Sequence, residues 1–185
     1  MRPRKELEIP SIPGVCIEDG FVMEPAESMR EYVTLGIRMD EYPDVHFSMA
    51  TTNKMKWVSS DALEPLLKQG EENARANGQG AWYDRIKNLR KGQRQLGQWK
   101  GFEILARLPA QKVEGPSHEF KYLSQGQPKN PNLPMLELEL HTGVHGNKVG
   151  STDPSLSDEE AVLLWDKLTN SIRIRPTTSN LKPER

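Results

Sequence analysis

Cysteine is nearly absent from this 185-residue chain, which contains only Cys16. A single cysteine cannot form an internal disulfide, so cysteine use does not indicate a redox compartment. No apolar run approaches the roughly eighteen residues that a membrane-spanning helix requires. Charge of one sign is also lacking, because 25 basic and 26 acidic residues leave a net charge of −1. Such a balance gives little attraction toward nucleic acid or an anionic membrane.

The chain length is typical of one folded domain. Residues 1–5 include three basic residues, but the residues that follow do not form the apolar segment of a signal peptide. We therefore predict a flexible segment over residues 1–9, a single α+β domain over residues 10–176 and a flexible tail over residues 177–185.

Alternating apolar residues predict antiparallel strands in the first part of this domain. The dipeptide Asp19-Gly20 is typical of a hairpin turn, and it separates the short apolar runs 15–17 and 21–23. Two longer alternating runs, over residues 33–39 and 45–49, follow one another closely. We expect these two runs to pair as antiparallel strands.

The middle of the chain predicts a helix over residues 61–76. Ser59, Ser60 or Asp61 is expected to cap its N-terminus, since each offers a side-chain oxygen to the first free backbone amides. Residues 81–89 are expected to form either a second short helix or an ordered loop.

The second half predicts more strands and the fold class. Residues 93–108 form either a strand pair or one long strand with glycine breaks, and residues 118–123 and 135–141 alternate as single strands. Strands joined by hairpins, with one helix in the middle and another at the end, indicate an α+β fold. We predict an antiparallel sheet with helices packed on one face.

The clearest local pattern is a helix near the C-terminus, over about residues 157–170. Ser157 and Glu160 have the spacing of a capping box, in which each side chain bonds the backbone amide of the other residue. We expect Leu164, Trp165 and Leu168 to pack this helix against Leu136, Leu138 and Leu140. A short strand over residues 172–175 is expected to follow, ending at Pro176.

This C-terminal stretch, which ends in SIRIRP at residues 171–176, resembles the C-terminal domain of the type VI secretion lipase-effector immunity protein family. Three other segments resemble the family in kind and order: IPGVCIEDG (12–20), LRKG with GQWKGFE (89–92 and 97–103) and PMLELELHTG (134–143). Together these segments span residues 9–176, which is nearly the whole chain.

The resemblance implies a non-enzymatic immunity protein that binds and inhibits a cognate lipase or phospholipase toxin delivered by a type VI secretion system. It also implies a periplasmic location, a further domain before this one in the family, and no cofactor or catalytic residue. Inhibition requires only a complementary surface, so few catalytic motifs are expected.

The catalytic motifs that the sequence approaches are incomplete. Residues 78–80 begin a dinucleotide-binding pattern but lack its third glycine, and residues 115–119 lack the closing glycine of a nucleophile elbow. Glu137 and Glu139 would project from the same strand face about 7 Å apart, a separation that also occurs in paired-carboxylate glycosidases. The preferred interpretation is the solvated face of an amphipathic strand.

A zinc site is the best small-site alternative. His141 and His145 would supply two ligands, with Cys16 or His118 folded nearby. The simpler interpretation is that His141 ends a strand and His145 lies in a loop, both in solvent. We therefore predict no metal site.

A basic and aromatic stretch over residues 82–100 offers a second class of function. Its six basic residues, together with Trp82, Tyr83 and Trp99, are the kind of side chains that bind nucleic acid. The isoelectric point of about 6.4 argues against this alternative, since such domains usually exceed about 9. Trp, Tyr and Arg are also enriched at protein interfaces, so we predict partner binding through Trp82, Tyr83 and Arg85.

Overall fold

The computed structural model of the chain divides into two compact units, Met1–Arg30 with Arg173–Arg185, and Glu31–Ile172. The structure describes residues 1–5, 8, 10–12, 14–17, 20–23, 32–111, 113–130 and 132–173. The predicted tail over residues 177–185 and the end of the predicted strand over residues 172–175 lie outside them. The predicted domain boundaries stay predictions.

The smaller unit contains a three-stranded antiparallel sheet of order β1-β3-β2. Its strands are β1 (Arg2–Pro3), β2 (Gly14–Ile17) and β3 (Gly20–Met23). Ile17 pairs with Gly20, so β2 and β3 form the predicted hairpin; Asp19 of its turn lies outside the described residues. Phe21 on β3 is buried, and the guanidinium carbon of Arg2 lies 5.1 Å from the centre of its ring.

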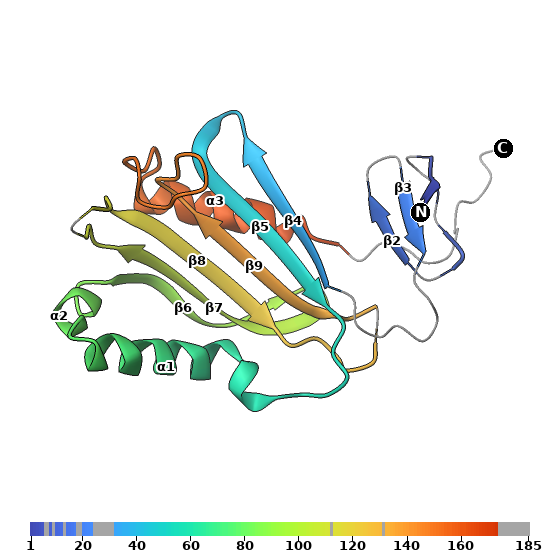
Figure 1. Ribbon diagram of the computed structural model, residues 1–185, viewed down its shortest axis with the longest axis horizontal. Coiled ribbons are helices and arrows are strands. Elements are labelled where there is room, and N and C mark those ends of the chain that lie inside the picture. Colours follow the sequence, from blue (N-terminus) through green and yellow to red (C-terminus); the bar gives the residue numbers. More distant parts are fainter. Residues whose placement is uncertain are drawn as a thin grey trace. The chain divides into compact units, whose positions relative to one another are not determined.

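The larger unit is built on a six-stranded sheet of order β4-β5-β9-β8-β7-β6 (Figure 1). Its strands are β4 (Tyr32–Met39), β5 (Tyr42–Thr52), β6 (Lys87–Leu96), β7 (Trp99–Leu108), β8 (Ser117–Ser124) and β9 (Met135–His141). All neighbouring strands are antiparallel, and the predicted pairing of the runs 33–39 and 45–49 is confirmed by β4 and β5.

Residues 93–108 form a strand pair, the first of the two alternatives. Gly97 at its turn has a φ of 57°, a left-handed conformation that glycine adopts without strain. The first strand of the pair, β6, begins at Lys87, inside the segment 81–89 that was expected to be a helix or a loop. The local sequence indicates a strand that begins only at residue 93. Pairing with the whole length of β7 extends β6 back to Lys87.

Three α-helices complete the larger unit among its described residues: α1 (Leu63–Ala76), α2 (Gly80–Tyr83) and α3 (Asp158–Asn170). The capping box of α3 is confirmed, because the side chains of Ser157 and Glu160 each accept from the backbone amide of the other. The predicted cap of α1 is wrong, since Ser59–Asp61 form a 3₁₀ turn and Ala62 becomes the cap residue without a side-chain bond. Within the described residues, no helix combines the length and the apolar content needed to cross a membrane.

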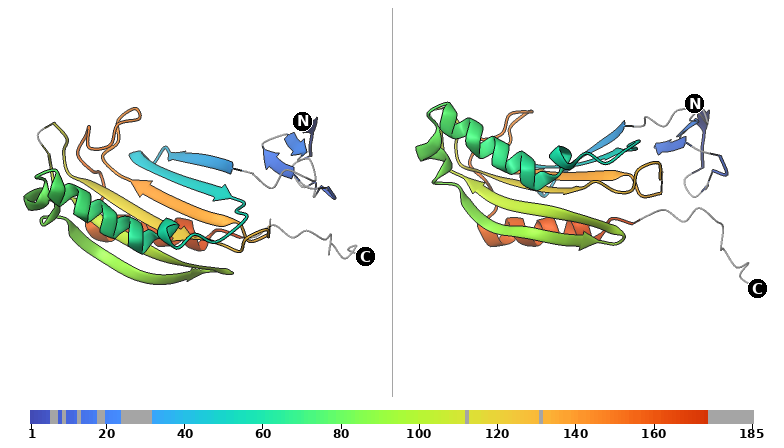
Figure 2. Two further views of the ribbon diagram at one scale, coloured as in Figure 1. Left: turned by 60° about the horizontal axis from the view of Figure 1, so that its bottom comes forward. Right: turned by 90° about the horizontal axis from the view of Figure 1, so that it is seen from below.

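Helices α1 and α3 lie on opposite faces of the six-stranded sheet (Figure 2). Trp165 of α3 packs against Phe47 and Phe120, with ring centres 6.1 Å apart in each pair. On the other face, Gln93 of β6 donates to Glu64 of α1 at 3.3 Å. The α+β class and the antiparallel sheet are confirmed, but the helices divide between two faces where one was expected.

The sequence of β7 supplies the reason for this division. Leu105 is fully buried on the α3 side, while Phe102, Ile104 and Ala106 alternate with it and lie on the α1 side. A strand with apolar residues on both faces requires cover on both faces, so a helix is needed on each side.

The buried face of α3 is centred on Trp165, which is 0% exposed. The packing of Trp165 against the sheet is confirmed, but Leu164 and Leu168 are only half-buried. Ala161 and Thr169 occupy the buried positions instead. Thr169 is tolerated there because its hydroxyl donates to the carbonyl of Trp165 at 2.7 Å, which satisfies the polar group.

Candidate functional site

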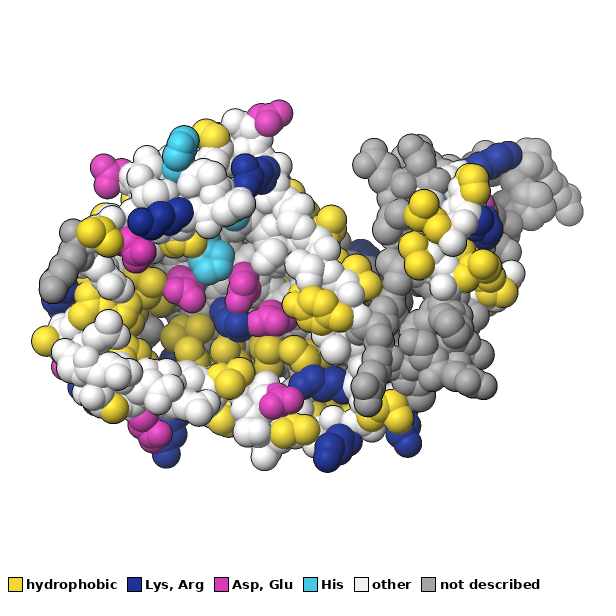
Figure 3. Space-filling model, in the orientation of Figure 1, with side chains coloured by type: hydrophobic (Ala, Val, Ile, Leu, Met, Phe, Trp, Pro, Cys, Tyr) yellow, Lys and Arg dark blue, Asp and Glu magenta, His cyan; other side chains and the backbone are white. Residues whose placement is uncertain are grey.

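The two faces of the six-stranded sheet are covered to different extents. Helix α3 lies across one face, whereas α1 lies along the β6 and β7 side of the other (Figures 1 and 2). Figure 3 shows acidic, basic and histidine side chains gathered at the centre of this second face, above a hollow lined with apolar side chains. We call it the open face, and define it by the side chains of Glu119, Lys121, Glu137, Glu139 and His141.

A charged cluster lies at the centre of the open face. Lys121 of β8 is directly opposite Glu139 of β9, and its Nζ donates to Glu139 Oε1 at 2.8 Å. The same Nζ also forms an ion pair with Glu137. His141 Nε2 lies 3.7 Å from the second oxygen of Glu139, which is an electrostatic contact rather than a hydrogen bond.

The pKa values of the cluster follow from these contacts. His141, and then Lys121, lower the pKa of Glu139 to about 2 against the opposing effect of burial. Burial works against the charge of Lys121, but its bonds to Glu137 and Glu139 raise its pKa. Both carboxylates are held by one lysine and are a quarter to a third exposed, which agrees with the solvated strand face preferred above.

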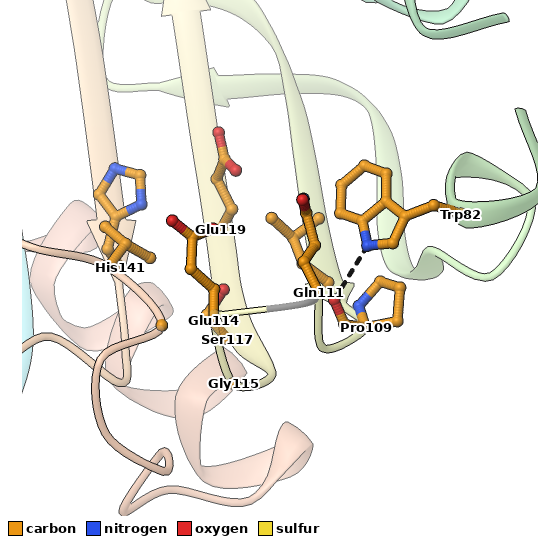
Figure 4. A pocket seen from close by; sticks show the side chains of 11 residues that line it. Trp82, Pro109, Gln111, Glu114, Gly115, Ser117, Glu119 and His141 are labelled. Atoms are coloured by element: carbon orange, nitrogen blue, oxygen red, sulfur yellow. Dashed lines mark hydrogen bonds between the residues drawn. The ribbon is translucent and has the colours of Figure 1, made fainter. Parts of the chain in front are cut away.

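A pocket of about 290 Å³ lies beside the charged cluster (Figure 4). Its walls come from α2, the end of β7, the loop before β8, strands β8 and β9, and the loop after β9. The lining residues are Trp82, Leu108, Pro109, Gln111, Glu114, Gly115, Ser117, Glu119, His141, Val149 and Gly150. Figure 4 shows the side chains of Glu114, Glu119 and Gln111 standing between His141 and Trp82.

Several polar groups of the pocket have no partner within the part of the chain that the structure describes. The carboxylates of Glu114 and Glu119 form no hydrogen bond or ion pair there. His141 Nδ1 is closed off from solvent and also lacks a hydrogen-bond partner. Unpaired polar groups beside an aromatic wall are a common feature of ligand sites.

The predicted partner-binding residues lie at and after α2. Trp82 is half-buried in the pocket wall, and its Nε1 donates to the carbonyl of Pro109 at 3.1 Å. Tyr83 is also half-buried, with the guanidinium carbon of Arg75 5.9 Å from its ring centre. The structure therefore places Trp82 in the pocket wall. Arg85, three residues later in the chain, is exposed to solvent.

Three of the six basic residues in the stretch proposed for nucleic acid pair with acidic side chains of the fold. Arg90 and Arg94 both donate to Glu103, at 2.6 and 2.7 Å, beneath α3. Lys87 forms an ion pair with Asp158 at 2.7 Å. Trp99 is buried. Half of the basic side chains are neutralised by carboxylates and the ring of Trp99 is not available to stack on a base, so the structure gives the nucleic-acid alternative no support.

The histidines considered for zinc are not brought together. His141 is opposite Glu119 on the open face. Because successive residues of a strand point to opposite faces, His118, which precedes Glu119 on β8, points to the α3 side of the sheet. There His118 is fully buried between Thr142 and Asp158, at 2.9 and 3.0 Å, and burial lowers its pKa. Within the described residues, no group of three or more potential ligands lies close enough to hold a metal ion.

Sequence reasoning missed the acidic side of the pocket. Glu114 lies in the loop before β8, and Glu119 lies on β8 beside the histidine of the next strand. Only the strand assignment of residues 118–123 offered a signal, since it places Glu119 on the same face as Lys121. The approach of Trp82 depends on how α2 packs against the end of β7, which local sequence does not encode.

A family model described as the "Tle cognate immunity protein 4 C-terminal domain" matches residues 8–177. No relative is found among curated proteins. Among solved structures, the immunity protein TplEi of the T6SS from Pseudomonas aeruginosa is similar in two crystal structures. The one with an "L" peptide is 27% identical, with a TM-score of 0.69 over 95% of this chain and 59% of that one. The apo structure is 26% identical, with a TM-score of 0.69 over 96% and 55%.

A chain in a Tle4–Tli4 complex is also similar. It is 28% identical, with a TM-score of 0.69 over 96% of this chain and 56% of that chain. The chain described here therefore spans less than two thirds of the length of each of these solved relatives.

Proposed function

The chain belongs to the family of the Tle cognate immunity protein 4 C-terminal domain, and on this premise we propose that it is an immunity protein that binds and inhibits a cognate lipase effector. The effector is a lipase or phospholipase delivered by a type VI secretion system. The observation that carries the proposal is the family match, which spans nearly the whole chain. The similarity to a chain of the Tle4–Tli4 complex supports a protein as the partner.

The protein is proposed to act without catalysis. An inhibitor needs a surface that fits the partner and excludes its substrate, and it needs no reacting group of its own. The open face supports this, because Glu137 and Glu139, which resemble a catalytic pair by spacing, are both held by Lys121. A carboxylate with its pKa lowered to about 2, as in Glu139, is a poor general acid or base near neutral pH.

The partner surface is proposed to include Trp82, Tyr83 and Arg85. Two half-buried aromatic side chains and an exposed arginine lie within four residues, next to the pocket of the open face. Aromatic and arginine anchors supply much of the binding energy of protein interfaces. The partly covered sheet supplies a rigid support for them.

The proposed site of action is the periplasm, where an immunity protein would meet an effector that attacks membrane lipids. This follows from the family alone. Fractionation of cells that carry the native gene tests it: the protein should appear with a periplasmic marker, and recovery with a cytoplasmic marker alone would contradict it.

One experiment tests the proposal as a whole. The lipase encoded beside this gene is mixed with the purified chain, and co-elution on gel filtration and hydrolysis of a micellar phospholipid are measured together. We expect a stable complex and loss of lipase activity at a molar ratio near one. An unrelated lipase of similar size is the matched control and should keep its activity. A cognate lipase that stays free and active at a large excess of the chain would refute the proposal.

A further inference from the structure

The pocket beside Trp82 differs in charge from the cluster next to it. In the cluster, Lys121 balances Glu137 and Glu139. In the pocket, the carboxylates of Glu114 and Glu119 have no cation within the described residues. Glu119 is exposed and Glu114 is half-buried, so both carboxylates are accessible and lie where a ligand entering the pocket would meet them.

The opposite wall of the pocket is aromatic and apolar. Trp82 is fixed there by the bond from its Nε1 to the carbonyl of Pro109, and Leu108 and Pro109 continue the wall. Because the indole N–H is already used, Trp82 offers the pocket its ring rather than a hydrogen bond. A ring of this kind attracts a cation placed over its face.

These two walls together select the chemistry of the ligand. Glu114, Glu119 and His141 do not lie close enough together to ligate one metal ion, as no such group exists among the described residues. A guanidinium is larger than a metal ion, carries five donors in a plane, pairs with a carboxylate through two bonds and stacks on an aromatic ring. The pocket volume of about 290 Å³ leaves room for such a side chain.

We propose that this pocket receives an arginine side chain of the partner protein, with its guanidinium between Glu119 and the ring of Trp82. Glu114 contributes the second negative charge. The inference rests on the proposed function for the identity of the partner. Beyond that function, it specifies that the partner inserts a guanidinium group into the pocket.

A small probe tests the pocket without the effector. N-acetylarginine methylamide is titrated into the full chain while the indole N–H signals of its four tryptophans are followed by NMR, with Trp82→Phe identifying the signal of Trp82. We expect a saturable shift of that signal. The citrulline analogue has the same shape without the charge, and it should bind at least about tenfold more weakly, which corresponds to about 1.4 kcal/mol. The lysine analogue should also bind more weakly.

Two variants of equal charge sharpen this test. Glu119→Gln should abolish the shift, whereas Glu159→Gln removes one carboxylate from α3 on the opposite face and should leave it unchanged. Urea unfolding of both variants establishes that they fold. The inference fails if the arginine and citrulline probes bind equally, if lysine binds as well as arginine, or if Glu119→Gln keeps the shift.

Binding of the effector itself provides a second, independent test. Glu119→Gln should weaken binding of the neighbouring lipase at least about tenfold, while Glu159→Gln should bind like the parent. If parent and Glu119→Gln bind the lipase equally, the pocket inference is overturned and the proposed function stands. If the parent does not bind the lipase, the proposed function fails, and the probe titration decides the pocket by itself.

Discussion

The two faces of the six-stranded sheet carry acidic side chains in opposite circumstances. On the α3 face, Glu103 is 3% exposed and accepts from Arg90, Arg94 and the indole N–H of Trp165. On the open face, Glu139 accepts from Lys121 and keeps a third of its side chain in solvent. Both are strand glutamates with a basic partner on the neighbouring strand.

Whether a helix covers a charged residue therefore determines whether that residue stabilises the fold or stays available to a partner. Beneath α3, a carboxylate withdrawn from water must be fully hydrogen-bonded, and it then fixes the helix on the sheet. On the open face, water can solvate the same groups, so the ion pairs add little stability and the surface is available to a partner. Substitutions on the first face should therefore change folding, and substitutions on the second should change binding.

The largest effect is expected at Trp165. Trp165→Ala removes a fully buried ring that contacts Phe47 and Phe120, and leaves a cavity between α3 and the sheet. The free energy of unfolding should fall by about 3–5 kcal/mol in urea denaturation. Leu163→Ala on the same helix is the control, because Leu163 is 68% exposed and its loss should cost less than about 0.5 kcal/mol. Equal losses in the two variants would contradict the face assignment.

The next effect is expected at Glu103. Glu103→Gln keeps an acceptor for the Trp165 indole but removes the charge that balances Arg90 and Arg94. We expect the free energy of unfolding to fall by about 2–3 kcal/mol. Breaking a fully buried ion pair typically costs about 3–5 kcal/mol, and the loss should be smaller here because Arg90 is partly solvated. Asp166→Asn, at a carboxylate that is 31% exposed, should cost less. If Asp166→Asn costs more than Glu103→Gln, burial does not control these ion pairs.

Much of the α3 face was predictable from the sequence, because its signals are local. The capping box of Ser157 and Glu160 and the stripe around Trp165 are set by spacing along one helix. The burial of Glu103 was not predictable. It depends on Arg90 and Arg94 of β6 and Asp166 of α3 meeting around Glu103 of β7, and each of these residues alone is typical of a solvated face.

The open face was predictable only in part. Strand alternation placed Glu137 and Glu139 on one face, which the structure confirms. The pocket was not foreseen, because Trp82, Glu114 and Glu119 meet through the packing of a four-residue helix and a loop against the sheet. Contacts between residues so far apart in sequence leave no periodic signal in the chain.

Trp82→Ala tests the open face as a binding surface. We expect affinity for the cognate lipase to fall by about 2 kcal/mol or more, at least about thirtyfold, in a titration of binding. The melting temperature should stay within a few degrees, because Trp82 is half-buried and its indole makes one hydrogen bond. Tyr83→Ala and Arg85→Ala test the remaining proposed residues. If all three variants fold and bind like the parent, the interface lies elsewhere.

The smallest effect on stability is expected at Glu139. The pH dependence of this effect tests whether the ion pairs of the open face contribute to folding at all. Because the pKa of Glu139 is lowered from 4.5 to about 2 in the fold, its contribution to stability is present above pH 4.5 and is lost as the pH falls toward 2. Glu139→Gln should cost about 0.5–1 kcal/mol near pH 6, since the side chain is a third exposed. Urea denaturation of parent and variant at pH 6, 4 and 2.5 should show this difference shrinking with acid. A difference that stays constant from pH 6 to 2.5 would mean that the ion pair with Lys121 and the contact with His141 do not stabilise the fold. The open face would then differ from the α3 face even more sharply, with its charges serving recognition alone.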